Sequence, residues 1–329
     1  MGRRSLRTLL VAVVTAVLTG GLVLAAPSAG AAVRPIGPLS PASGALFGAL
    51  VNPNRADPSS TPAEVSALEG KIGRTLEIVN HFYTYQQQVG TQGEVQDIAG
   101  GRTPMITWGA TSTTRIKQGL EDAWIRAQAT RIKNLGAPVF LRYFHEPEGN
   151  YRNTMVASAA DYITAWKRAR TLFNAVGATN VVWVFCTTAY SFRVSETRPP
   201  QSFYPGDAYV DWIGADGYNF APVKPGAKWN SFSQVFSRWY AWAAQRPKPL
   251  MAAEYGVLDD PSIPGRKAAW YDDMRTAVPT TFPLLQAVVA WSTANTKEGR
   301  VLDWNVDSSA SALAAWQRMA LDPYFMSSS

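Results

Sequence analysis

Cysteine and histidine are scarce in this chain of 329 residues, which has one cysteine, Cys186, and two histidines, His81 and His145. One cysteine cannot form an intrachain disulfide. Two histidines are too few for a multi-histidine zinc site. Cys186 ends an apolar run, Val181–Cys186, so we interpret it as a small buried hydrophobe rather than a nucleophile. A packed core must therefore stabilise the fold.

Long runs of like charge are also missing. The formal net charge is +7, of which three units come from Arg3, Arg4 and Arg7 at the N-terminus. No later cluster of lysine and arginine could follow a phosphate backbone, so we expect no nucleic-acid partner. No segment after residue 32 is apolar enough to span a membrane.

The first 32 residues are typical of an export signal. A positive start is followed by an apolar run from about residue 9 to residue 26 and by the small residues Ala29-Gly30-Ala31-Ala32. We predict a cleaved signal peptide over residues 1–32 and a secreted, extracellular protein. The alternative is an uncleaved membrane anchor, although Gly20 and Gly21 dilute the run. The pair Arg3-Arg4 leaves the Sec and twin-arginine routes both open.

Short apolar runs recur along the rest of the chain, with helical stretches between them. We predict a lead-in segment over residues 33–44 and one domain over residues 45–326. The runs are continuous rather than alternating, as buried parallel strands tend to be. The eight predicted strands are Ala45–Val51, Thr75–Tyr83, Pro104–Trp108, Pro138–Phe144, Val181–Thr187, Val210–Asp216, Pro249–Glu254 and Leu285–Ser292.

The segments between the runs have helical periodicity. One predicted helix extends from Ile116 to Leu135, and another has an apolar stripe from Tyr162 to Phe173 and ends near Gly177. Eight strands that alternate with helices predict a single-domain α/β fold, the (β/α)8 TIM barrel. An open doubly wound sheet is the alternative, but no glycine-rich phosphate turn follows Val51.

Polar and aromatic side chains gather where the predicted strands end. In a TIM barrel these ends form one rim, which carries the active site. Two glutamates end apolar strands there, Glu146 after the fourth and Glu254 at the end of the seventh. A charge at such a position is costly unless it is paired or functional. One alternative is a structural salt bridge, for example between Glu146 and Arg142.

Glycosidic bond cleavage needs two carboxyl groups. One protonates the leaving oxygen, and the other attacks the anomeric carbon or activates water. The fourth and seventh strands lie on opposite sides of an eight-stranded ring, so Glu146 and Glu254 can face each other across a sugar. Tyr218, after the sixth strand, is placed to donate a hydrogen bond to Glu254.

Three segments resemble glycoside hydrolase family 26. Arg142-Tyr143-Phe144-His145-Glu146 is similar to the Arg-x-x-His-Glu signature of that family. Residues 209–219 resemble its sixth strand, and residues 249–256 resemble its nucleophile strand.

The resemblance implies a retaining endo-β-glycanase. The resemblance implies that Glu146 is the acid/base and Glu254 the nucleophile. It also implies that His145 positions the acid and contacts the sugar, and that Trp291 forms the floor of the subsite at the cleavage point. Most of the family cut β-1,4-mannan, so we expect an endo-β-1,4-mannanase. Mixed-linkage β-1,3-1,4-glucan and β-1,3-xylan are the alternatives on the same scaffold.

The turn after Glu146 departs from the family pattern. It contains Tyr151 and no tryptophan, where mannanases have a tryptophan cluster. Glu148, in the same turn, could rival Glu146, but Glu146 lies at the strand end.

Further binding residues are expected at the rim. Arg142, Trp108 and His81 are candidates to bind substrate, although Trp108 could equally pack in the core and His81 could be a satisfied buried histidine. Asp216 could pair with Arg142 rather than contact sugar.

We expect a monomer whose partner is a polysaccharide and whose chemistry needs neither cofactor nor metal. A secreted glycan-binding barrel without catalysis is the main non-enzymatic alternative, but it would be expected to lack one of the two glutamates. A repetitive cell-wall protein would show repeats, and we find none.

Overall fold

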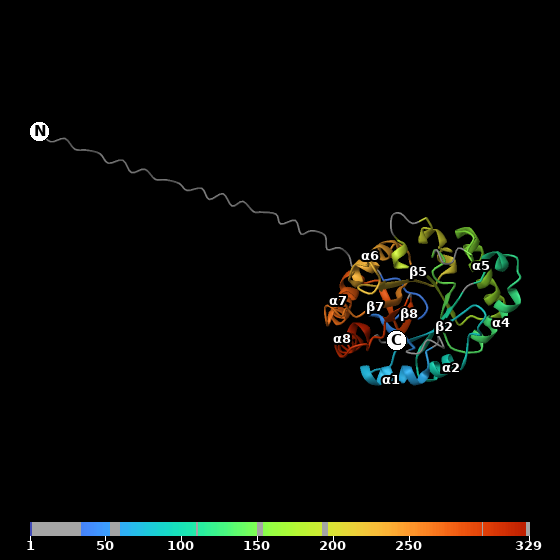
Figure 1. Ribbon diagram of the computed structural model, residues 1–329. Helices are drawn as coiled ribbons and strands as arrows, with labels where there is room; N and C mark the ends of the chain where they lie inside the picture. Colours follow the sequence, from blue (N-terminus) through green and yellow to red (C-terminus); the bar gives the residue numbers. More distant parts are fainter. Residues whose placement is uncertain are drawn as a thin grey trace. The chain divides into compact units, whose positions relative to one another are not determined.

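Eight parallel strands form the centre of the fold (Figure 1). Each strand pairs with the next, and β8 pairs with β1, which closes the sheet into a barrel. The predicted (β/α)8 barrel is therefore confirmed. The strands are β1 Leu46–Asn52, β2 Ile78–Tyr83, β3 Thr103–Trp108, β4 Val139–Tyr143, β5 Val181–Thr188, β6 Trp212–Asn219, β7 Leu250–Val257 and β8 Leu285–Lys297.

The computed structural model describes Met1 and residues 34–52, 60–109, 111–149, 154–192, 197–297 and 299–326. Tyr151 and, apart from Met1, the predicted signal peptide lie outside these residues. Residues 34–329 make up one unit, and residues 1–33 make up the other.

Helices surround the strands (Figure 1). Their ends follow local sequence signals: Thr91 and Ser231 form capping boxes at the starts of α2 and α6, and Gly177, with φ 75°, ends α5 as predicted. The α-helices are α1 Pro62–Ile72, α2 Gln92–Ala99, α3 Thr113–Lys117, α4 Asp122–Lys133, α5 Ala159–Val176, α6 Phe232–Ala243, α7 Arg266–Thr281 and α8 Ala310–Ala320. Single 3-10 turns are η2 Ala189–Ser191, η3 Pro200–Phe203, η4 Asp207–Tyr209 and η5 Pro323–Phe325.

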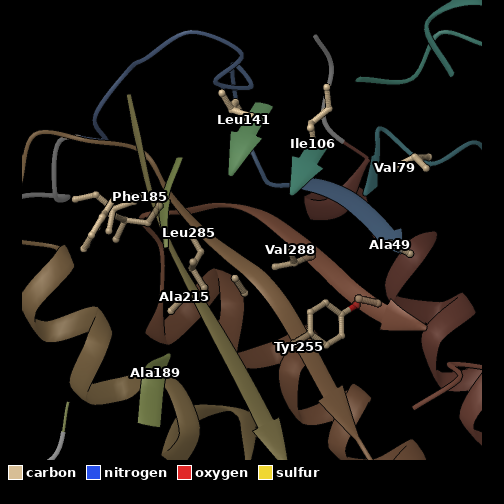
Figure 2. Packing of buried hydrophobic residues seen from close by; sticks show 14 of the residues in the cluster. Ala49, Val79, Ile106, Leu141, Phe185, Ala189, Ala215, Tyr255, Leu285 and Val288 are labelled. Atoms are coloured by element: carbon tan, nitrogen blue, oxygen red, sulfur yellow. The ribbon is translucent and has the colours of Figure 1, made fainter. Parts of the chain in front are cut away.

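The strands separate two apolar layers. Side chains that point away from the barrel axis pack against the helices in one large cluster, in which Val79, Val288 and Tyr255 are visible (Figure 2). Side chains that point inward, such as Ile78 and Phe140, fill the barrel itself. This alternation along each strand decides which side chains reach the interior.

Two predicted elements differ from the structure. The predicted helix from Ile116 to Leu135 is two helices, α3 and α4, because Gly119 adopts φ 79° between them and Leu120 is exposed. The eighth strand continues past Ser292 to Lys297 and pairs antiparallel with a strand that sequence reasoning missed, β9 Arg300–Asp303.

The described part of the lead-in packs on the barrel. Leu39 contacts the interior cluster. The indole nitrogen of Trp212 donates to the carbonyl of Pro38 at 2.7 Å, and the side-chain amide of Gln286 donates to the carbonyl of Pro35 at 2.6 Å. The segment thus covers the end of the barrel where the strands begin. Among the described residues, we find no helix with the length and apolar character of a membrane span.

Candidate active site

A cleft of about 610 Å³ opens where the strands end. It contains Glu146 and Glu254, so the two predicted carboxylates meet in one cavity. The lining residues are Leu50, Asn52, Phe82, His145, Glu146, Tyr218, Phe220, Glu254, Trp291, Thr293, Asn295, Thr296, Leu302 and Trp304.

The chain leaves β4 through an unusual backbone conformation that aims Glu146. Phe144 and Glu146 have φ angles of 48° and 52°, which are uncommon for residues other than glycine. Their amides are held by neighbouring strands: Phe144 N donates to the carbonyl of Trp108 at 3.0 Å, and Glu146 N donates to that of Cys186 at 2.8 Å. Such strain persists only where the surroundings fix it, and it concentrates at functional sites.

A β-bulge in β7 aims Glu254. Ala215 pairs with Ala252, but the next residue, Asp216, pairs with Glu254, so Ala253 is an extra residue in β7. Both Ala253 and Glu254 therefore face the interior, and Tyr255 faces the helices. Regular alternation would have turned Glu254 outward. A bulge beside a cleft is a common way to redirect a side chain.

Arg142 connects the carboxylates beneath the cleft. Its guanidinium is fully buried and donates to Asp216 Oδ1 at 2.6 Å, to Glu254 Oε1 and to Thr107 Oγ1 at 2.9 Å. Arg142 therefore supports the site from below rather than lining the cleft. Its ion pair with Asp216 confirms the predicted pairing of these residues.

One guanidinium faces two buried carboxyl groups. Burial raises the pKa of Asp216 well above its usual value, and the attraction of Arg142 offsets this only in part. Burial also raises the pKa of Glu254. The charge of Arg142 and a hydrogen bond from the Tyr218 hydroxyl to Glu254 Oε2 act in the opposite direction and lower it. Glu254 receives two charge-stabilising donors, whereas Asp216 Oδ2 meets no hydrogen-bond partner in the described structure. We therefore expect Asp216 to hold a proton more tightly than Glu254.

Aromatic side chains form the cleft wall beside the carboxylates. Phe82 stands edge-on to both His145 and Trp291, with ring centroids 5.2 and 5.9 Å apart. Trp291 is partly exposed in the cleft, so its face can stack on a sugar ring. His145 and Tyr218, two of the predicted substrate-binding residues, also line this cavity.

A second hollow of about 890 Å³ lies on the other side of Glu146. It shares Glu146, Tyr218 and Phe220 with the first cleft, so a long ligand can extend past the carboxylates in both directions. Its remaining lining residues are Glu148, Gly149, Thr188, Ala189, Tyr190, Ser191, Asp216, Gly217, Lys224, Asn230, Gln234, Val235 and Arg238.

Trp108 does not reach the cleft. Its ring is fully buried on the outer side of β3, stacked on Tyr85 at 5.2 Å, and its indole nitrogen donates to the Tyr85 carbonyl at 3.2 Å. Trp108 is a core residue and not a subsite, because the alternation of β3 turns it toward the helices.

His81 also points outward from the barrel. It is buried, and its Nε2 lies 2.5 Å from Asp97 Oδ2 on α2. The expectation that His81 binds sugar is therefore corrected: His81 forms a buried pair with Asp97, away from the cleft.

No group of three or more histidine, cysteine or acidic side chains among the described residues is arranged to hold a metal ion. The cleft itself combines two carboxyl groups with aromatic walls, an arrangement that can protonate and displace a glycosidic oxygen.

Comparison with protein families agrees with this geometry. The family model "Glycosyl hydrolase family 26" matches residues 73–264. The chain belongs to glycosyl hydrolase family 26. It is therefore a glycoside hydrolase, and the predicted resemblance is confirmed.

Among curated proteins, this family 26 chain is similar to endoglucanase H of Acetivibrio thermocellus, with 33% identity over 256 residues. The match spans 74% of this chain and 27% of the relative, so it concerns about a quarter of that protein's length.

Solved structures share the fold at low sequence identity. The GH26 domain of the endo-β-mannanase/endo-β-glucanase PbGH26-GH5A of Prevotella bryantii aligns with a TM-score of 0.60 and 14% identity, over 86% of this chain and 90% of that one. The β-mannanase BoMan26A of Bacteroides ovatus aligns with a TM-score of 0.59 and 16% identity, also over 86% and 90%.

Several cleft residues were missed by sequence reasoning. Trp304 and Asn295 reach the first cleft through the β8–β9 hairpin, and Tyr190 borders the second hollow from η2. The available signal for the hairpin was Gly299, which adopts φ 74° in the turn between β8 and β9. Nothing in the sequence pattern marked Tyr190.

Proposed function

We propose that this chain is a retaining endo-β-glycanase in which Glu146 is the acid/base and Glu254 is the nucleophile. The observation that carries the proposal is the meeting of these two carboxyl groups in one cleft, with Glu254 held by Arg142 and Tyr218. Two donors on Glu254 favour its ionised form, which a nucleophile needs.

The proposed reaction has two steps. Glu146 gives its proton to the glycosidic oxygen while Glu254 attacks the anomeric carbon, and a covalent glycosyl-enzyme forms. Glu146, now a carboxylate, takes a proton from water, which attacks the same carbon and releases Glu254. Trp291 and His145 hold the sugar whose bond is cleaved.

Endo-action is supported by the shape of the site. Hollows lie on both sides of Glu146 and share its side chain, so sugar units can be bound before and after the scissile bond. A pocket closed on one side would favour removal of terminal sugars instead.

The proposed substrate is a β-linked polysaccharide, first β-1,4-mannan, because most of the family that the motifs resemble cut mannan. A mixed-linkage or β-1,4-glucan is the second candidate, favoured by the 33% identity with a protein named endoglucanase H. β-1,4-Mannan and β-1,4-glucan differ at the C2 hydroxyl of every sugar, so any subsite that contacts this hydroxyl can select between them.

The test is to incubate the chain without residues 1–32 separately with mannan, galactomannan, barley β-glucan and β-1,3-xylan, and to measure reducing ends. Release from mannan or from glucan decides between the candidates, and no release from any of them overturns the proposal. The β-anomer should be the first product seen by proton NMR if the configuration is retained. Glu254→Gln should abolish turnover, and azide should partly restore the activity of Glu146→Ala but not that of Glu254→Gln.

We also propose that the protein is exported and that residues 1–32 are removed. N-terminal sequencing of protein recovered from the culture medium of an expressing bacterium tests this. A mature chain that begins near residue 33 is expected, and a chain that stays in the membrane fraction with Met1 intact would contradict it.

A further inference from the structure

Lys267 is a buried cation that the proposed mechanism does not use. It lies in the first turn of α7, and its side chain is fully buried. Its ammonium donates to the carbonyl of Asn305 and to Ser308 Oγ, each at 2.8 Å, and lies 3.5 Å from the carbonyl of Asp303. The burial of an ammonium is costly unless such partners satisfy it. The side chain therefore joins α7 to the segment that follows β9.

Acidic side chains around Lys267 favour its charged form. Asp259 Oδ2 lies 3.8 Å from the ammonium and accepts a hydrogen bond from Ser308 Oγ. Burial lowers the pKa of Lys267 to about 8, and the charges of Asp259, Asp303 and Asp307 oppose this fall. The charged side chain has three protons, and each of its three near acceptors can take one.

The segment that Lys267 holds contains Trp304. The carbonyls of Asp303 and Asn305 belong to the residues on either side of this tryptophan. Trp304 borders the first cleft but is only 4% exposed, so it offers little of its face to a sugar. Its ring instead packs edge-on against Tyr218 and Phe220, with centroids 5.0 and 5.2 Å apart. Trp304 therefore supports the aromatic wall beside Glu254.

The ring of Tyr218 is confined by Trp304 and by the backbone of β7. Gly256 is two residues after Glu254, and a Cβ atom there would lie 2.8 Å from Tyr218 Cδ1 and 2.9 Å from Trp304 Cε3. Both rings therefore lie directly on β7, where only a glycine leaves room for them. In this position the Tyr218 hydroxyl donates to Glu254 Oε2.

We propose that Lys267 and Trp304 are positioning residues that hold the hydroxyl of Tyr218 on Glu254. The inference rests on the proposed function, because it takes Glu254 as the nucleophile. A hydrogen bond weakens steeply when its distance or angle is lost, so a small rotation of the Tyr218 ring removes one of the two donors that favour ionised Glu254. Lys267 is fully buried and cannot contact substrate, so it acts only through the segment that contains Trp304.

The test is a double-mutant cycle between Lys267 and Tyr218, with kcat measured on the glycan that the wild type cleaves. Lys267→Met removes the donors and fills most of the space. It should lower kcat by about 3- to 10-fold, less than Tyr218→Phe does, because it misplaces the hydroxyl rather than removing it. In the Tyr218→Phe background, Lys267→Met should change kcat by less than about twofold, since no hydroxyl is left to position.

Gly256→Ala disturbs the same rings without removing a hydrogen bond of Lys267. The new Cβ atom must displace Tyr218 or Trp304. We expect a lower kcat in the wild-type background and a change of less than about twofold in the Tyr218→Phe background. This second cycle decides the question if Lys267→Met does not fold.

Arg74→Met is the matched control for the loss of a backbone anchor. Arg74 also donates to two carbonyls, those of Ala320 and Phe325, at 2.9 and 2.6 Å, and it does not line the cleft. Arg74→Met should lower Tm, as Lys267→Met does, and leave kcat unchanged. A similar loss of kcat in both variants would mean that any weakened anchor slows the reaction, and the inference would fail.

The outcomes separate this inference from the proposed function. If Lys267→Met lowered kcat by the same factor with and without the Tyr218 hydroxyl, or did not lower it at all, Lys267 would only support the fold. The inference would then be overturned, and the proposed function would remain intact. A wild-type chain that cleaves no glycan, or a Glu254→Gln variant that keeps its turnover, would instead overturn the proposed function and this inference with it.

Discussion

Replacement of Arg142 by methionine should destabilise the fold in a pH-dependent way. Methionine has a similar length and no charge, so Arg142→Met removes the cation and fills most of the space. Two buried carboxyl groups, Asp216 and Glu254, then lose their ion pair, and Thr107 loses a donor. Loss of one partner of a buried pair costs about 3–5 kcal/mol, because the remaining charge stays buried without compensation.

The sign of the pH dependence follows from the pKa values of the carboxyl groups. Burial already raises the pKa of both Asp216 and Glu254, and removal of Arg142 raises them further. A carboxyl with a raised pKa binds more protons in the folded state, so its stability contribution is lost as the pH rises above the unfolded value of about 4. The cost of Arg142→Met should therefore be small near pH 4 and complete near pH 8.

Urea unfolding at these two pH values measures the effect. Arg168→Met is the matched control, because Arg168 pairs bidentately with Asp122 at the surface, where its side chain is 37% exposed. A surface pair contributes at most about 1 kcal/mol. If Arg142→Met lost the same stability at both pH values, or no more than Arg168→Met, buried charge would not be the reason that Arg142 matters.

Four further substitutions separate the cleft from the core. Tyr218→Phe removes the hydroxyl that donates to Glu254 and should lower kcat by about 10- to 100-fold. It should also cost about 1–3 kcal/mol in unfolding, because Glu254 is buried and loses a donor. Trp108→Ala should cost about 3–5 kcal/mol in urea unfolding and leave the KM of the folded fraction unchanged. A raised KM would mean that Trp108 contributes to substrate binding. His81→Asn should likewise lower Tm without altering KM, because its partner is Asp97. Tyr190→Ala should raise KM on the polysaccharide about tenfold and leave hydrolysis of an aryl glycoside unchanged, since Tyr190 borders only the second hollow.

The barrel was predictable because its signals are repeated along the chain. Eight buried parallel strands require eight apolar runs, and each error in a strand boundary is small compared with the spacing between runs. The stripe from Tyr162 to Phe173 is buried as its period predicts. The prediction of one helix across Ile116–Leu135 was wrong because the spacing of apolar residues does not show where a glycine turns the chain. Gly119 makes such a turn.

The direction of each side chain was harder to predict than its position. Simple alternation would have been enough for Trp108 and His81, which point outward, but not for Glu254. Glu254 faces the cleft only because Ala253 is an extra residue in β7. A bulge depends on the pairing with both neighbouring strands, so no single segment of sequence contains it.

The same distortions explain why a regular barrel becomes a site. A regular strand end would turn one of every two residues to the helices, and a glutamate there would be buried against apolar side chains at high cost. The bulge at Ala253 instead turns Glu254 to the cleft, where Tyr218 and Arg142 reach it. The positive φ angles at Phe144 and Glu146 accompany an outward Phe144, while His145 and Glu146 both line the cleft. These departures from the pleat lie at the two strand ends that carry the glutamates, whereas another register shift, between β7 and β8 at Leu250/Met251, lies at the opposite end of the barrel.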